Sequence, residues 1–175
     1  MKKIFLSALV ALTLTACTGG GNPNPSPDPT PVGWGEASTI TAAQLKGCPL
    51  GDTLEQGKID PSVNTCIKGT LNGITDAGST QKCSLTMDGA GTLTFSSPVL
   101  ARSITLKPAT SVYYTHKTDN GVHTVMYSLE DNRYASSGRV DIGFAYYETI
   151  TASTMPNVTI SVQVDNQKAA CYTRI

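Results

Sequence analysis

The sequence predicts a mainly β fold, either an antiparallel β-sandwich or a small β-barrel. Residues 158–164 read Val-Thr-Ile-Ser-Val-Gln-Val, with apolar and polar side chains in strict alternation. Such alternation is typical of a strand with one buried face. Comparable segments recur at short intervals with turn residues between them, which is the pattern of sandwiches and barrels.

The expected elements lie within residues 37–175, which we assign to one folded domain. Thr41 and Gln44 have capping-box spacing ahead of Leu45, which predicts one helical turn that ends by Gly47. Residues 48–65 carry prolines and glycines without periodicity, so we expect an irregular loop there.

From about residue 65 onward, inward-facing apolar residues alternate with polar ones and predict strands. Asn120-Gly121 stands between the segments 112–118 and 122–130, and this dipeptide accommodates the positive φ values of a tight hairpin turn. The inward-facing sets of the other predicted strands are Leu85 and Met87; Leu93 and Phe95; Ile104 and Leu106; and Val140, Ile142, Phe144 and Tyr146.

The N-terminus has the layout of an export signal. Lys2 and Lys3 precede a mostly apolar stretch at residues 4–14, which is about half of what a helix needs to span a bilayer. Leu14-Thr15-Ala16-Cys17 follows at once. This segment resembles the lipobox of bacterial lipoproteins, in which Leu lies three residues before the Cys and a small residue directly before it.

The resemblance implies a protein attached to a membrane by lipid. Residues 1–16 would be the cleaved signal peptide, and Cys17 would carry diacylglycerol on its thiol and a further acyl chain, such as palmitate, on its new amine. Two or three acyl chains anchor a protein stably. Thr18 stands where an inner-membrane retention signal would have Asp. We therefore expect the outer membrane as the location. Two orientations are compatible with this: the domain on the periplasmic face or on the cell surface.

Residues 17–36 are predicted to form a tether between the lipid and the domain. Glycines at 19–21 come first, and prolines then occupy every second position from 23 to 31. Proline fixes φ and favours extended geometry in the residue before it. We therefore expect a semi-rigid polyproline II spacer behind a flexible glycine hinge.

The remaining four cysteines, Cys48, Cys66, Cys83 and Cys171, predict two disulfides, because an exported domain with an even number of thiols is typically cross-linked. The register of neighbouring strands disfavours a bond between Cys66 and Cys83. We favour Cys48–Cys66 and Cys83–Cys171 over the other pairings. Their wide spacing is unlike that of zinc ligands.

Charge and composition exclude several classes of function. The 13 basic residues balance the 13 acidic ones, which leaves no electrostatic footprint for nucleic acid. A mean hydropathy of −0.09 excludes a polytopic membrane protein. No catalytic or cofactor-binding motif stands out, so we expect no enzyme activity and no cofactor.

The two histidines, His116 and His123, flank the predicted Asn120-Gly121 turn. A two-residue loop would place them diagonally on one face, whereas a three-residue loop would place them on opposite faces. We expect exposed strand histidines and no metal site. The alternative is a weak metal-binding or pH-sensing pair.

Tyrosines concentrate in the β half of the chain and suggest a binding face. Adjacent tyrosines on a strand point to opposite sides, so one ring of each pair faces outward. We take Tyr114, Tyr127 and Tyr147 as the candidate face, since tyrosine contributes a large contact area. Ordinary strand propensity is the alternative explanation.

Together these features predict a lipid-anchored cell-envelope protein with a non-catalytic β domain. Its role would be binding, adhesive or structural, with an envelope protein or an extracellular ligand as partner. One alternative is an envelope inhibitor of a hydrolase. Another is a small hydrolase or metal-dependent enzyme, which would require His116 or His123 to meet carboxylates in a pocket.

Overall fold

The predicted antiparallel, mainly β fold is confirmed by the computed structural model, which describes residues 33–55, 59–76, 78–108, 111–131 and 140–175. The predicted signal peptide, Cys17 and most of the predicted tether lie outside these residues. Two short helices, α1 (Ala42–Lys46) and α2 (Pro61–Cys66), accompany the strands. The strands are β1 (Gly51–Glu55), β2 (Lys68–Ile74), β3 (Lys82–Asp88), β4 (Leu93–Ser96), β5 (Ile104–Leu106), β6 (Ser111–Asp119), β7 (Val122–Asp131), β8 (Val140–Tyr147), β9 (Val158–Val164) and β10 (Gln167–Thr173).

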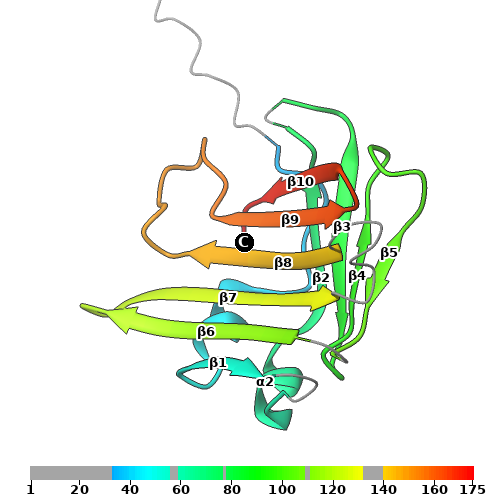
Figure 1. The fold of residues 1–175 in the computed structure, drawn as a ribbon. Coiled ribbons are helices and arrows are strands. Elements are labelled where there is room, and N and C mark those ends of the chain that lie inside the picture. Colours follow the sequence, from blue (N-terminus) through cyan, green and yellow to red (C-terminus); the bar gives the residue numbers. More distant parts are fainter. Residues whose placement is uncertain (1–32, 56–58, 77, 109–110, 132–139) are drawn as a thin grey trace, which may run out of the picture. The chain divides into compact units, whose positions relative to one another are not determined.

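The strands form one antiparallel sheet that curls on itself as a half-barrel. Its order is β1-β6-β7-β8-β9-β10-β2-β3-β4-β5, so the chain runs through two groups of neighbouring strands. Figure 1 shows β6 to β9 running across the direction of β2 to β5. The two groups therefore face each other over a shared core, as in an orthogonal packing of two sheets.

The junction between the two groups is a single sharp corner. Among the described residues, β10 and β2 share one ladder pair, Tyr172 with Ile74. Gly73 allows this contact, because a Cβ there would lie 2.5 Å from the Tyr172 carbonyl oxygen and 2.9 Å from the Cys171 sulfur. The predicted disulfide Cys83–Cys171 is present and links the two groups at the same corner.

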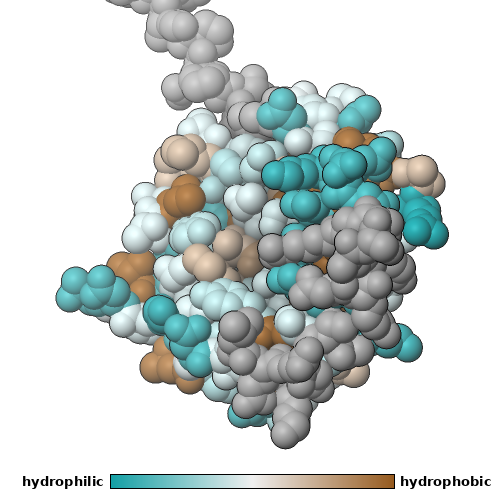
Figure 2. All heavy atoms as spheres, in the orientation of Figure 1, coloured by the Kyte–Doolittle hydropathy of each residue, from teal (hydrophilic) through white to brown (hydrophobic). Residues whose placement is uncertain are grey.

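The core lies between the two groups of strands. Figure 2 shows the apolar residues of the visible face, in brown, as small separate patches, whereas most large apolar side chains are buried. The residues predicted to face inward on β8 are all buried. On β9, Val158, Ile160 and Val162 are buried and Val164 is partly buried. The largest fully buried side chains are Tyr127, Phe95, Ile40, Leu45, Ile67, Leu71, Leu85, Met87, Leu93, Leu129, Ile142 and Ile160.

Two local predictions from turn and cap chemistry are confirmed. Thr41 and Gln44 form the reciprocal capping box of α1, and Gly47 ends that helix. Asn120 and Gly121 adopt φ values of 49° and 80° between β6 and β7, as a tight hairpin requires.

The segment 48–65, predicted to be an irregular loop, instead contains β1 and most of α2. Asp60 caps α2 by accepting a hydrogen bond from the Ser62 amide, and Pro61 occupies the first turn. This cap and proline are a helix-start signal that does not depend on periodicity. β1 forms through its pairing with β6, which local sequence does not encode. The predicted disulfide Cys48–Cys66 closes this segment.

The folded domain begins earlier than residue 37. Trp34 is buried to 9% exposure and donates from Nε1 to the Ser153 carbonyl at 3.2 Å. Glu36 forms an ion pair with Lys82 of β3. The last residues assigned to the tether, from Trp34 onward, therefore pack against the domain, because the indole of Trp34 is buried there.

The corner predicts a strong effect of Gly73→Ala on stability. The added methyl group would meet backbone and sulfur atoms rather than a flexible side chain. We therefore expect the free energy of unfolding to fall by about 1–3 kcal/mol. Urea denaturation followed by circular dichroism measures it. Gly51→Ala is the matched control, because no atom lies within 4 Å of its Cβ position. Equal stability of the two variants would contradict the proposed tight corner.

Candidate functional site

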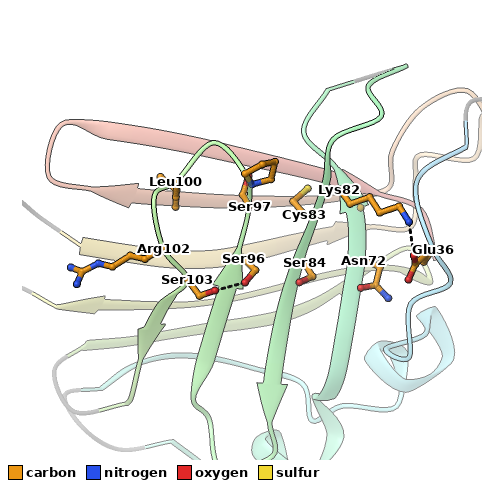
Figure 3. A pocket seen from close by; sticks show the side chains of 12 residues that line it. Glu36, Asn72, Lys82, Cys83, Ser84, Ser96, Ser97, Leu100, Arg102 and Ser103 are labelled. Atoms are coloured by element: carbon orange, nitrogen blue, oxygen red, sulfur yellow. Dashed lines mark hydrogen bonds and ion pairs between the residues drawn. The ribbon is translucent and has the colours of Figure 1, made fainter.

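A groove on the outer face of β2, β3 and β4, lined by both polar and apolar residues, is the candidate site that we consider. Its volume is about 430 Å³, within the range that small ligands occupy. Figure 3 shows a row of short polar side chains along its floor, with residues of the β4–β5 loop beside them. The floor row consists of Asn72, Ser84, Ser96 and Ser103.

Strand register builds this row. Asn72 of β2 lies opposite Ser84 of β3, and Ser84 lies opposite Ser96 of β4. Ser103, just before β5, continues the row through a hydroxyl–hydroxyl hydrogen bond with Ser96. Because successive strand residues point to opposite faces, these side chains face outward while their neighbours fill the core.

The row retains hydrogen-bonding capacity toward a ligand. The Asn72 amide donates to the Ala37 carbonyl at 2.9 Å, and the Ser96–Ser103 pair shares one bond. Ser84, at the centre, makes no side-chain hydrogen bond with any described residue. A hydroxyl can donate one hydrogen bond and accept two, so the floor presents donors and acceptors next to each other.

The groove has one charged pair at its end. The Lys82 ammonium lies 2.6 Å from a Glu36 carboxylate oxygen. This hydrogen bond and the lysine charge lower the pKa of Glu36 below its ordinary value, which already makes the side chain a carboxylate at neutral pH. Arg102 at the other end points away from the serines in Figure 3. The floor itself is therefore neutral.

The candidate histidine pair lies elsewhere, in the β6–β7 hairpin. The two-residue turn places Thr118 opposite His123, as one of the two predicted alternatives requires. His116 Nε2 lies 2.9 Å from His123 Nδ1, and the ring centroids are 5.2 Å apart. The expectation of exposed histidines is wrong for His116, which is 2% exposed because β1 and the segment around Cys48 pack beside it.

The hydrogen-bond partners of His116 set the tautomer of its neutral ring. The Cys48 carbonyl can only accept, so His116 donates to it from Nδ1 at 2.9 Å. In the neutral ring, His116 Nε2 then accepts from Nδ1–H of His123. No group of three histidines, cysteines or acids suited to a metal occurs among the described residues. Through the hydrogen bond between His116 and the Cys48 carbonyl, the pair links the β6–β7 hairpin to the segment that follows α1.

The predicted tyrosine face is wrong for two of its three members. Tyr114 and Tyr127 are 3% and 0% exposed, and their hydroxyls donate to the carbonyls of Pro49 and Gly91. Tyr147 alone is partly exposed. Tyr113, not Tyr114, is the partly exposed member of its pair, because the parity of β6 places Val112 and Tyr114 in the core.

The sequence does not reveal the groove residues, because they are brought together by the register between neighbouring strands. Each of β2, β3 and β4 has a polar–apolar–polar triplet, namely Thr-Leu-Asn, Ser-Leu-Thr and Thr-Phe-Ser. Alternation alone places these polar residues on the outer face, but it does not align one strand with the next.

Comparison with protein-family models, curated proteins and solved structures gives no match. No helix among the described residues is long and apolar enough to cross a membrane.

The burial of Tyr114 predicts a loss of stability at high pH. Burial, with a smaller contribution from the charge of Asp60, raises its pKa to about 12. An unfolded chain releases this proton near pH 10, so the free energy of unfolding should fall as the pH rises from about 10 to 12. Tyr114→Phe should make this part of the curve shallower, with the buried Tyr127, whose pKa is also raised, accounting for much of the remaining fall, whereas Tyr113→Phe, at a partly exposed ring, should leave the curve as in the wild type. Urea denaturation of the variants between pH 9 and 12 measures the difference, and identical curves would contradict it.

Proposed function

We propose that the chain is a lipid-anchored cell-envelope protein whose β domain binds neutral, hydroxyl-rich ligands, that is glycans, without transforming them. The observation that carries the proposal is the Ser84 hydroxyl, which no described side chain or backbone group engages, at the centre of the Asn72–Ser84–Ser96–Ser103 row in a groove of about 430 Å³.

The chemistry of the row suits sugar hydroxyls. Sugar hydroxyls both donate and accept hydrogen bonds, and so do serine and asparagine side chains. The charged residues that line the groove, the Glu36–Lys82 pair and Arg102, lie at its ends, so no counter-charge lies beneath an ionic ligand on the floor itself. A purely apolar ligand would cover Ser84 and leave its hydroxyl without a partner, which costs free energy.

The groove also favours binding over catalysis. General acid–base chemistry needs a group that exchanges a proton near the working pH. The ion pair with Lys82 keeps Glu36 deprotonated. The histidine pair belongs to β6 and β7 and lines no part of this groove. These features support a binding role over that of a small hydrolase.

The proposed anchor rests on the Leu14-Thr15-Ala16-Cys17 segment and its resemblance to a lipobox. An anchor of this kind would hold the domain, through the proline-rich tether, beside the glycans of the envelope. The outer membrane is the proposed location, because Thr18 stands where Asp would signal retention in the inner membrane.

Ser84→Ala tests the groove. Loss of one neutral hydrogen bond should weaken glycan binding by about two- to tenfold. The full-length protein would be titrated with neutral malto-, cello- and chito-oligosaccharides by isothermal calorimetry. Ser161→Ala, at an exposed serine of β9, is the matched control and should bind like the wild type. Failure of the wild type to bind any neutral glycan on an array would overturn the proposal, as would equal effects of the two variants.

Cys17→Ser tests the anchor. We expect the wild-type protein to sediment with membranes and its N-terminal peptide to carry two or three acyl chains by mass spectrometry. The variant should lose both properties, because it lacks the thiol that accepts the lipid. Cys48→Ser, which breaks the Cys48–Cys66 disulfide of the domain, should keep the lipid. An unacylated mature N-terminus in the wild type would show the anchor to be absent.

A further inference from the structure

A second row of hydroxyls lies beside the groove on the same face of the sheet. Thr70 of β2 is opposite Thr86 of β3, Thr86 is opposite Thr94 of β4, and Thr94 is opposite Thr105 of β5. This Thr row is two residues along each strand from the floor of the groove. We infer that groove and Thr row form one site, which binds the end of a linear glycan chain.

The geometry fixes how such a chain would lie. The two rows are about 6.5–7 Å apart, since each strand rises about 3.3 Å per residue. Along β4 and β5, Ser96 and Ser103 adjoin the connecting loop, whereas Thr94 and Thr105 lie farther from it. The loop lines the groove on one side, and the Thr row extends its floor on the other. A chain with its terminal sugar in the groove would continue over the Thr row, along the strands.

The Thr row retains hydroxyl donors for a ligand. The Thr70 and Thr86 hydroxyls are 3.0 Å apart, and so are those of Thr94 and Thr105. Each bonded pair uses one of its two donors, so the other donor remains for a ligand. Thr86 and Thr105 are exposed, and their methyl groups add apolar contact area for the carbon faces of sugar rings.

The two rows carry no charge of their own, and the nearby charges, including Arg102 of the groove lining, lie at their ends, which favours a neutral chain over a polyanion. Beyond the Thr row, Lys68 lies directly opposite Asp88 across β2 and β3. At the groove end, Lys82 pairs with Glu36. Between these two pairs, the two rows contain only hydroxyl and amide side chains. This inference rests on the proposed glycan-binding role and specifies the length and polarity of the ligand.

The experiment compares short and long ligands on the same variants. Isothermal calorimetry of the full-length protein would use neutral oligosaccharides of two to six sugars, from the series that the wild type binds. Thr86→Val with Thr94→Val removes two hydroxyls at nearly constant shape, and valine is well tolerated in strands. We expect wild-type affinity to rise with chain length, and this double variant to weaken the hexasaccharide about tenfold but the disaccharide less than twofold.

Two controls separate the possible failures. Thr159→Val, at a partly buried position of β9, should not change either affinity. Ser84→Ala should weaken short and long ligands alike, because its hydroxyl lies in the groove. Affinity that is independent of chain length, or equal losses for both ligands in the threonine variant, would overturn the chain-end site while leaving glycan binding intact. Absence of any neutral glycan binding by the wild type would overturn the proposed function itself and this site with it.

Discussion

The corner between β10 and β2 is the constraint on which the rest of the domain depends. Two groups of strands meet there through one ladder pair, and only a glycine at position 73 lets the backbone of β10 approach so closely. The bond between Cys83 and Cys171 joins residues 88 positions apart at this point. In the chain-entropy account, closing a loop of that length stabilises the fold by about 4–5 kcal/mol. Without this cross-link, few backbone hydrogen bonds would keep the two groups together.

The same corner positions the candidate site. Cys83 is paired with Gly73, and the next pair along the ladder is Ser84 with Asn72. Successive residues face opposite sides, so the disulfide lies on the inner face while Ser84 and Asn72 begin the outward row. The groove floor is therefore held by a covalent link one residue away. A floor fixed in this way can present its hydroxyls without an ordering cost when a ligand binds.

Local sequence predicted the elements far better than their assembly. Alternation located most strands, Asn120-Gly121 located a hairpin, and Thr41 with Gln44 located the first helix, because each signal is complete within a few residues. The parity of β6, which buries Tyr114 and not Tyr113, depends on contacts with distant strands. The floor row and the Thr row depend on register across three or four strands. Sequence alternation shows that their hydroxyls face outward, but only pairing brings them side by side.

Placing the binding groups on the outer face also separates binding from folding. Leu71, Leu85 and Phe95 fill the core from the same strands whose alternate positions carry the threonines and serines. Removing a partly exposed hydroxyl leaves these core contacts in place, so its effect on stability should be small, usually within about 0.5 kcal/mol. In contrast, a ligand that depends on several such hydroxyls loses part of its affinity with each one. Variants of the two rows can therefore report on recognition in a domain whose corner, core and disulfides stay unchanged.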